Sequence, residues 1–297
     1  MIEEPGSITC IYCGAEAKIF DKRAYHRYAP EFGPFRIFIC KSCGALLTNP
    51  VPDDEVTGAM YRSFDGGMFS KARELRRKYP LKTWFRQCLK HMMQNTGLEN
   101  KKDFTWIDIG AGEGEMSELM LSQFPNHEGT VLDFHSVPER LRNQPVNWIA
   151  TDLNKTFPVE LEQADLVFAI TVLEHMADPV NFIRSALGLV KPGGVLYFNC
   201  PRTDCNAFKI LGKKWPYYIA GEHITIPSIR GLQKLMDREC ARLFKEGYEV
   251  RVRPVILPYP FGFYLGYYLP FLERVLPFSF NVYLPTGLLE CQVIRHH

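Results

Sequence analysis

The sequence predicts an α/β protein with a doubly wound, mostly parallel sheet. The apolar run at residues 104–107 is typical of a buried parallel strand, and the glycine-rich segment Asp108-Ile109-Gly110-Ala111-Gly112-Glu113-Gly114-Glu115 follows it directly. The next apolar residues have the spacing of one helix face: Met116, Leu119, Met120 and Phe124. Strand, glycine turn and helix in succession predict a ligand site, because glycine tolerates positive φ and lets backbone N–H groups approach a ligand closely.

The glycine spacing argues against a dinucleotide. The dinucleotide fingerprint is G-x-G-x-x-G, whereas this segment reads G-x-G-x-G, with Glu115 at the place of the third fingerprint glycine. Glu113 and Glu115 would also repel a pyrophosphate. An acid followed by G-x-G-x-G after the first strand resembles motif I of the class I S-adenosylmethionine (AdoMet) methyltransferases. The resemblance implies that the cofactor lies against this segment, at Asp108, Gly110, Ala111, Gly112 and Gly114.

The next two apolar runs also end near acids. Residues 130–134 include Asp133, and in doubly wound folds an acid at the tip of the second strand binds ribose hydroxyls. The resemblance places Phe134 beside it. Residues 146–150 lead to Asp152, which the resemblance assigns to the adenine amino group, with Leu153 beside the ring.

The strongest pattern is D-L-V-x-A-x-x-V-L-E-H-x-x-D-P at residues 165–179, followed by P-G-G at 192–194. It predicts a fourth strand, a helix capped by Asp178 with Pro179 at its first position, and a fifth strand at residues 195–199. The pattern resembles motifs IV and V of the same methyltransferases, and the match covers about residues 104–201. The resemblance implies a seven-stranded Rossmann-like sheet, with Ile170 and Thr171 beside the cofactor.

Composition sets broad limits. The chain has 297 residues, 46% of them hydrophobic, which allows one large or two modest domains. A net charge of +2 argues against a nucleic-acid partner. The acidic first residues contain no apolar signal segment, and nine cysteines in such a chain indicate thiols or metal ligands. We therefore expect a cytoplasmic protein.

Residues 1–52 are predicted to form a zinc-binding module. Cys10-x-x-Cys13 and Cys40-x-x-Cys43 are identical pairs, each followed by glycine and separated by 26 residues. Four thiolates close a tetrahedral Zn²⁺ site and leave no position for chemistry, so the role would be structural. The alternatives are reduced thiols without metal or a redox pair. This arrangement, with N-P-x-P at residues 49–52, resembles the zinc-binding front end of some small-molecule methyltransferases, including sugar C-methyltransferases. That resemblance implies that Tyr61 and Phe69 approach the cofactor.

Residues 53–100 are expected to form a helical linker or cap before the methyltransferase domain at 101–297. Residues 71–90 contain eight Lys and Arg residues and a single acidic residue, Glu74. This basic amphipathic stretch could grip a phosphate or anionic lipid, but a helix that covers the sheet is the favoured interpretation.

The catalytic candidates lie after the fourth and fifth strands. His175 follows the fourth strand on the expected substrate side, although it could only pack the turn. A lid is predicted at residues 202–227, where a segment resembles G-x-x-W-x-x-Y…E-H of related zinc-fronted methyltransferases. It offers Trp215, Tyr218, Glu222 and His223 to the substrate. His223 could instead cap the next helix near Ser228.

No catalytic metal is expected from the sequence. Some related quinone O-methyltransferases carry an E-x-x-E-H metal site, but Thr171 replaces its first glutamate here.

Residues 254–287 are predicted to be an insertion between the last two strands. Residues 254–272 are uncharged and hold seven aromatic residues, but four prolines argue against a membrane-spanning helix. The insertion could be a hydrophobic lid, a peripheral membrane contact, a homodimer interface or a packed subdomain.

The sequence therefore predicts AdoMet-dependent methyl transfer to a small-molecule acceptor, such as a secondary metabolite, a sugar or a lipid- or quinone-like compound. The alternative is an RNA methyltransferase with a zinc-containing recognition module, which the low net charge disfavours. A non-catalytic AdoMet-binding protein is a third reading, against which the intact glycine segment and three acids count.

Overall fold

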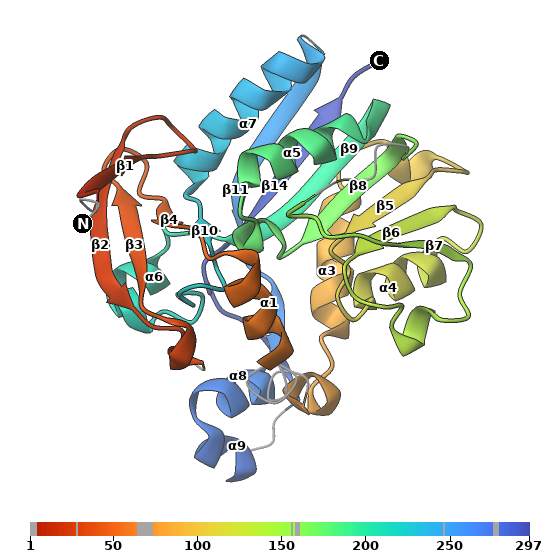
Figure 1. Ribbon diagram of the computed structural model, residues 1–297. Coiled ribbons are helices and arrows are strands. Elements are labelled where there is room, and N and C mark those ends of the chain that lie inside the picture. The colour runs from red at the N-terminus through yellow and green to blue at the C-terminus, as the bar shows by residue number, and fades with distance from the viewer. Residues whose placement is uncertain are drawn as a thin grey trace.

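The computed structural model describes residues 5–27, 29–63, 74–155, 157, 161–245, 247–275 and 279–297, without the side chains of residues 61–63, 267, 268 and 270. A large central sheet carries helices on both faces, and a smaller N-terminal sheet lies beside it (Figure 1).

Seven strands of the described chain form the central sheet in the order β11-β14-β9-β8-β5-β6-β7. Their bounds are β5 (Trp106–Ile109), β6 (Gly129–Asp133), β7 (Val146–Ala150), β8 (Ala164–Ile170), β9 (Val190–Pro201), β11 (Tyr248–Val255) and β14 (Leu288–Arg295). Only β14 runs antiparallel to its neighbours β9 and β11 among these strands. The predicted doubly wound, mostly parallel sheet is confirmed.

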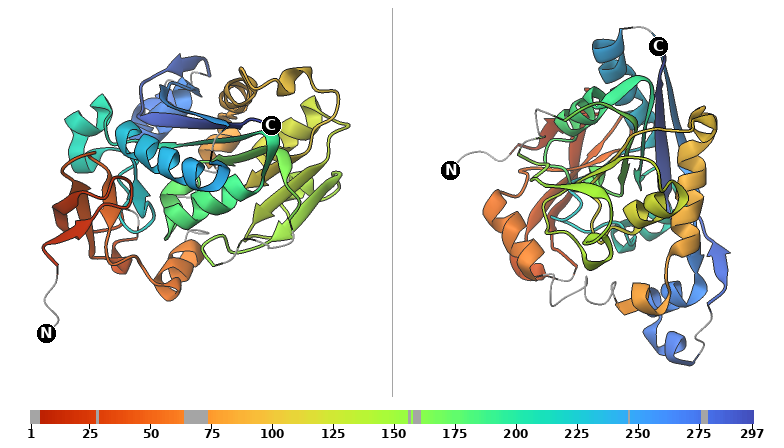
Figure 2. Two further views of the ribbon diagram at one scale, coloured as in Figure 1. Left: turned by 90° about the horizontal axis from the view of Figure 1, so that it is seen from above. Right: turned by 90° about the vertical axis from the view of Figure 1, so that its right-hand side faces the viewer.

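Alternating side chains of the strands supply two separate cores. On β8, Leu166 and Phe168 pack with α3 (Lys82–Met93) and α4 (Glu115–Gln123). Val167 and Ala169 point to the other face, toward α5 (Pro179–Gly188) and α7 (Ile229–Phe244). Figure 2 shows these helices on the two sides of the sheet. The favoured interpretation of α3, a helix that covers the sheet, is confirmed by its buried face.

Helix starts follow the predicted capping chemistry. The Asp178 carboxylate accepts hydrogen bonds from the N–H groups of Val180 and Asn181 at the start of α5. Ser228 caps α7 by accepting from the Gly231 N–H, so the idea that His223 caps this helix is wrong. The P-G-G segment at residues 192–194 is part of β9, which begins earlier than the predicted fifth strand, and a register irregularity opposite β8 accommodates it.

The N-terminal sheet is antiparallel, and a distant segment completes it. It contains β1 (Ser7–Thr9), β2 (Glu16–Ala24), β3 (Phe35–Cys40), β4 (Leu46–Thr48) and β10 (Thr225–Ile226). A short 3₁₀ turn, η1 (Pro30–Phe32), lies between β2 and β3. Because β10 comes from the segment after β9, this sheet is joined to the region predicted to be the lid. No pattern in the sequence indicates that strand.

The remaining elements connect or flank the two sheets. They are α1 (Asp54–Ser63), η2 (Leu98–Asn100), η3 (Glu139–Leu141), η4 (Leu173–His175), α6 (Asn206–Leu211) and η5 (Gly212–Lys214). Residues 74–78 are also helical.

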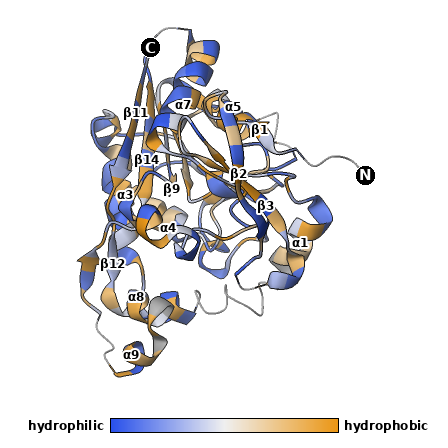
Figure 3. Cartoon of the chain, turned by 90° about the vertical axis from the view of Figure 1, so that its left-hand side faces the viewer, coloured by the Kyte–Doolittle hydropathy of each residue, from blue (hydrophilic) through white to orange (hydrophobic). Residues whose placement is uncertain are grey.

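The segment between β11 and β14 forms a small substructure of its own. A hairpin of β12 (Pro258–Pro260) and β13 (Asn281–Tyr283) accompanies α8 (Phe261–Tyr268) and α9 (Pro270–Val275). Figure 3 shows hydrophobic colouring on α8 and α9 at the lower end of the molecule. Within the described part of the chain, no helix has both the length and the apolar character needed to cross a bilayer.

Candidate active site

The glycine turn after β5 opens toward a cavity at its middle residue. Gly110 has φ +74° and Gly112 has φ +56°. A Cβ on Gly110 would lie 2.7 Å from Val172 Cγ2, and one on Gly114 would lie 2.6 Å from Leu141 Cδ1, so both positions are closed by packing. A Cβ on Gly112 would meet nothing within 4 Å. The turn therefore leaves space for a ligand over Gly112.

Two buried acids hold this turn. Asp133 at the end of β6 accepts a 2.8 Å hydrogen bond from the Gly112 N–H and two 2.9 Å hydrogen bonds from His135. Burial would raise the pKa of Asp133, but these hydrogen bonds outweigh it and hold the pKa below its ordinary value. Asp108 accepts a 2.5 Å hydrogen bond from the Ser117 hydroxyl, and burial raises its pKa to about 7.

Two cavities meet at the carboxyl ends of the strands. The larger, of about 630 Å³, is lined by the strand-end residues Asp133, Phe134, Asp152 and Leu153. The smaller, of about 360 Å³, is lined by Asp108, Ala111, Ile170 and aromatic side chains. Five residues line both: Gly110, Gly112, Thr171, His175 and Glu222. The two cavities are therefore adjoining parts of one site.

Thr171 lies at their junction in a backbone conformation that is uncommon for threonine. Its φ is +55°, and its N–H donates both to the carbonyl oxygen of Asn199, at 3.1 Å, and to its side-chain oxygen, at 3.0 Å. The buried Asn199 on β9 thus fixes the turn that follows β8. Non-glycine residues in this region of φ concentrate at functional sites.

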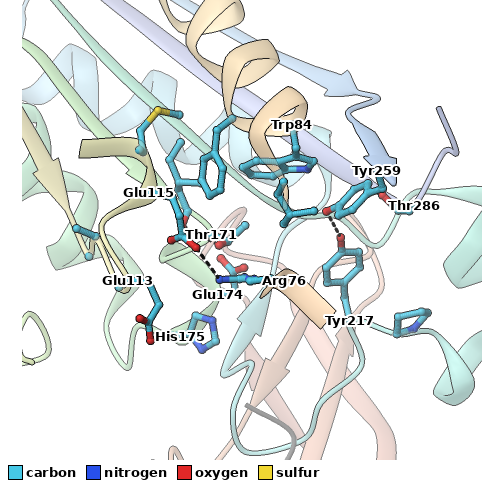
Figure 4. A pocket seen from close by; sticks show the side chains of 18 of the residues that line it. Arg76, Trp84, Glu113, Glu115, Thr171, Glu174, His175, Tyr217, Tyr259 and Thr286 are labelled. Carbon is cyan, nitrogen blue, oxygen red and sulfur yellow. Dashed lines mark hydrogen bonds and ion pairs between the residues drawn. The ribbon is translucent and has the colours of Figure 1, made fainter. Parts of the chain in front are cut away.

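Aromatic side chains from three segments wall the smaller cavity. Trp84 comes from α3, Tyr217 from the predicted lid and Tyr259 from the insertion, and Figure 4 shows them side by side. The hydroxyls of Tyr217 and Tyr259 are 3.4 Å apart, and the rings of Trp84 and Tyr259 have centroids 6.1 Å apart. Phe85, Phe263 and Tyr264 extend the wall. Burial raises the pKa of Tyr217 and Tyr259, so both phenols are neutral near pH 7.

Two histidines border this cavity with fixed tautomers. His175 Nδ1 lies 3.2 Å from the backbone carbonyl of Glu222, and His223 Nδ1 lies 2.7 Å from that of Tyr217. Because a carbonyl oxygen only accepts, each Nδ1 carries the hydrogen and each Nε2 keeps its lone pair. Burial lowers the pKa of both rings, that of His223 to about 4, so both are neutral near pH 7.

Two buried glutamates accompany the histidines. Glu174 is 1% exposed, burial raises its pKa to about 8, and its Oε2 has no hydrogen-bond partner among the described residues. Glu222 Oε2 lies 3.2 Å from Nε2 of His26 in the N-terminal module. The Ala29 N–H donates to His26 Nδ1, so Nε2 carries the hydrogen that Glu222 accepts. Burial would raise the pKa of Glu222, but this bond and the neighbouring histidines hold it below its ordinary value.

Two residues expected on the substrate side lie elsewhere. Tyr218 is absent from the described residues that line the two cavities, and its hydroxyl donates to Asp21 on β2 at 3.1 Å. Trp215 is fully buried and donates to the Thr286 carbonyl at 3.1 Å. The turn points Tyr217, one residue earlier than predicted, into the cavity.

The two aromatic residues expected beside the cofactor cannot be placed. The Tyr61 side chain and all of Phe69 lie outside the described residues.

The four predicted zinc ligands come together in the N-terminal module. Their sulfur atoms all lie within 4.8 Å of one another, with Cys10–Cys43 at 3.7 Å and Cys13–Cys40 at 3.4 Å. Tetrahedral Zn²⁺ with bonds of about 2.3 Å places its sulfurs about 3.8 Å apart, so the cluster has the right size. Gly14 and Gly44 have φ of +74° and +82°, which closes both knuckles in the same way.

The family comparison identifies the class of protein to which this fold belongs. Residues 76–239, more than half of the chain, match the family model described as a methyltransferase domain, and the chain belongs to this family. It resembles the ubiquinone biosynthesis O-methyltransferase of Pseudomonas savastanoi pv. phaseolicola, with 28% identity over 132 residues, 41% of this chain and 54% of that protein. It also resembles the trans-aconitate 2-methyltransferase of Azoarcus sp., with 30% identity over 103 residues, 33% of this chain and 39% of that protein. The chain thus spans about half the length, or less, of these curated relatives.

A solved structure agrees on the fold. The plantazolicin methyltransferase BpumL, in complex with a triazolic desmethylPZN analog and SAH, aligns with a TM-score of 0.58 and 18% identity. The alignment covers 82% of this chain and 97% of that one. At this identity the likeness establishes the shared fold.

Proposed function

We propose that the protein transfers a methyl group from S-adenosylmethionine to a small-molecule acceptor. The observation that carries the proposal is the pair of adjoining cavities, one lined by strand-end acids and the other by aromatic rings, with Thr171 and His175 on both. A group-transfer enzyme must hold a donor and an acceptor in contact and away from water. Membership of the methyltransferase family supports methyl as the group transferred.

The larger cavity suits the adenosine part of the cofactor. Asp133 lies at the tip of β6, the second strand of this sheet along the chain, where doubly wound folds bind ribose hydroxyls, and its carboxylate is kept ionised by His135 and Gly112. Asp152 and Leu153 lie on the same cavity, as an adenine-binding pair would. Bound S-adenosylmethionine would supply a methyl group made electrophilic by its sulfonium.

The smaller cavity favours a flat, apolar acceptor over a sugar. Its wall of Trp84, Tyr217 and Tyr259 offers ring faces, while charged and polar side chains, among them Arg76, Glu115 and Glu174, line other parts of the cavity. An aromatic secondary metabolite or a quinone-like compound fits this division. The curated relatives named for ubiquinone biosynthesis support the same choice.

The insertion takes part in this cavity. Tyr259, Phe263 and Tyr264 line it, which supports the lid interpretation among those raised by the sequence. On the other side of the insertion, Phe271 and Val275 are 65% and 74% exposed. Contact of residues 254–272 with a membrane and formation of a homodimer stay predictions, as does the cytoplasmic location.

We further propose that Cys10, Cys13, Cys40 and Cys43 hold a structural Zn²⁺. Four thiolates at this spacing fill its coordination, so the ion would fix the module of residues 1–52. That module has a task at the site, because its residue His26 holds Glu222.

The test is transfer of labelled methyl from S-adenosylmethionine into host extract, followed by partition between organic and aqueous phases. We expect label in an organic-soluble small molecule. Label in the aqueous small-molecule fraction would redirect the assignment to a sugar or polar metabolite. Label in RNA would favour the alternative of an RNA methyltransferase.

A further inference from the structure

Three side chains that can ligate a metal ion meet at the junction of the two cavities. One ligand atom each from Glu174, His175 and His223 lies within 4.8 Å of the other two. The first two follow each other in η4, directly after Thr171, and His223 comes from the predicted lid. All three line the smaller cavity, and His175 also lines the larger one. Figure 4 shows Glu174 and His175 among the side chains that line this cavity.

The histidines have the orientation that metal-binding histidines have. Each donates its Nδ1 hydrogen to a backbone carbonyl, which turns the Nε2 lone pair away from the backbone. Such an outer hydrogen bond fixes the tautomer and the ring direction of a ligand. The two rings lie edge to face with centroids 4.8 Å apart, so the two imidazoles are close neighbours in the site.

Glu174 supplies an independent indication of a ligand. Its carboxyl group is 1% exposed and its Oε2 has no hydrogen-bond partner among the described residues. A buried polar atom without a partner is costly, and such atoms call for an ion, a water or a catalytic role. Glu222 adds a second buried carboxylate to the lining of the same cavity. A cation would stabilise both.

We propose that Glu174, His175 and His223 bind a divalent cation with open coordination positions, and that these positions take an oxygen atom of the acceptor. Two imidazoles and one carboxylate suit Mn²⁺, Fe²⁺ or Zn²⁺ and leave room for substrate. Bonds of about 2.1 Å would draw the three side chains slightly together. The expectation of no catalytic metal rested on Thr171 in place of a glutamate, whereas the third ligand here is His223.

The choice of acceptor oxygen rests on the proposed function. A phenol or enol on the ion would lose its hydroxyl proton to water, and the resulting oxyanion would attack the methyl carbon. The O–CH₃ bond forms as the S–CH₃ bond breaks, and the bonding pair stays on sulfur as a neutral thioether. The predicted substrate class is therefore a hydroxylated planar compound that is O-methylated.

Binding of Mn²⁺ tests the site directly. Mn²⁺ prefers carboxylate, imidazole and water over thiolate, so it should not compete for the cysteine cluster. The full-length protein is first assayed for zinc and then titrated with Mn²⁺ while the signal of free aqueous Mn²⁺ is followed by electron paramagnetic resonance. We expect one Mn²⁺ per chain, with Glu174→Gln and His223→Ala each weakening it at least about ten-fold.

His91→Gln is the matched control, because His91 also pairs with a buried glutamate, Glu290, but lies outside both cavities. It should bind Mn²⁺ like the wild type. Absence of stoichiometric Mn²⁺ binding by wild-type protein at millimolar Mn²⁺ would overturn the proposal, as would equal affinity in the Glu174 and His223 variants. Calorimetry with S-adenosylmethionine runs in parallel, so that a failure of the cofactor assignment is seen separately from a failure of the cation site.

Discussion

The two clusters of metal-ligating side chains differ in their chemistry and in their surroundings. Cys10, Cys13, Cys40 and Cys43 form a set of four thiols in two knuckles, and none of them lines either cavity. Glu174, His175 and His223 form a set of three at the junction of two cavities. Four ligands complete a tetrahedron and hold a fold together, whereas three leave positions for a reacting molecule. With both proposals, the chain has one closed and one open metal site.

The two clusters are nevertheless connected. The loop with Glu222 and His223 packs on the N-terminal module, since a Cβ on Gly221 would lie 2.3 Å from the Phe35 ring and His26 binds Glu222. The N-terminal module therefore contacts the loop that supplies His223 to the second cluster.

Loss of the closed site should have the largest effect. Cys43→Ser should reduce bound zinc from one per chain to near zero and unfold the N-terminal sheet, because structural zinc sites contribute on the order of 10 kcal/mol to folding. Elemental analysis and circular dichroism would measure both. In contrast, removal of Mn²⁺ from wild-type protein by a weak chelator should leave the sheet intact. A Cys43→Ser protein that kept its zinc would contradict the assignment.

Asp108 is a buried acid that already has a hydrogen-bond partner, because the Ser117 hydroxyl donates to it. Its carboxyl group can therefore be tested without a metal ion. Burial raises its pKa from 3.8 to about 7, so the folded state holds the proton more tightly than the unfolded state. Its ionisation therefore destabilises the fold progressively as pH rises from about 4 to about 7. Asp108→Asn should raise the unfolding free energy at pH 8 by about 2–4 kcal/mol and have little effect at pH 4. Denaturant titrations at both pH values measure this, and an equal change at both would refute it.

A variant of Asp133 tests cofactor binding independently of the two metal-ligand clusters. Asp133→Ala should weaken S-adenosylmethionine binding at least about 100-fold, because the two ribose hydroxyls lose the charged acceptor of their hydrogen bonds. Zinc content and Mn²⁺ affinity should stay at wild-type values. Calorimetry gives the affinity, and an unchanged value would show that the ribose assignment to Asp133 is wrong.

His26 tests the connection between the clusters. His26→Asn keeps an acceptor near the Ala29 N–H but loses the donor to Glu222, so methyl transfer and Mn²⁺ affinity should each fall about ten-fold. His26→Gln is the control, because its amide can reach Glu222, and it should recover most of both. Cofactor affinity should not change in either variant. Equal activity of the two variants would mean that the Glu222 contact is only packing.

The smallest effect is expected at Tyr218. Tyr218→Phe removes a hydrogen bond to Asp21 and should cost about 1 kcal/mol of stability, with kcat/KM within about two-fold of wild type. Tyr217→Phe is the comparison, since its hydroxyl faces the cavity beside Tyr259. It should lower kcat/KM more than Tyr218→Phe does. The reverse ranking would restore the prediction made from the sequence.

The sequence predicted the sheet and the polar residues at its carboxyl edge because both depend on local patterns. The spacing of Gly110, Gly112 and Gly114 and the acids at strand ends are short-range signals that a parallel sheet brings to one edge. The candidate zinc ligands could be predicted equally well, since each C-x-x-C pair forms its own knuckle over a few residues.

The acceptor side could not be predicted in the same way. Trp84, Tyr217 and Tyr259 come from three distant segments, and only tertiary packing brings them together. The choice of Tyr217 over Tyr218 depends on the direction of a single turn. The approach of His223 to Glu174 depends on how the lid docks on the N-terminal sheet through β10.

The most direct test of this account is one crystal structure of the protein with S-adenosylhomocysteine and Mn²⁺, with anomalous data collected at the zinc and manganese edges. We expect a zinc peak among the four cysteines and a manganese peak among Glu174, His175 and His223. We also expect the nucleoside between Asp133 and Asp152, with the sulfur atom of S-adenosylhomocysteine directed toward the smaller cavity. A nucleoside bound elsewhere, or manganese absent from the three-residue cluster, would contradict it.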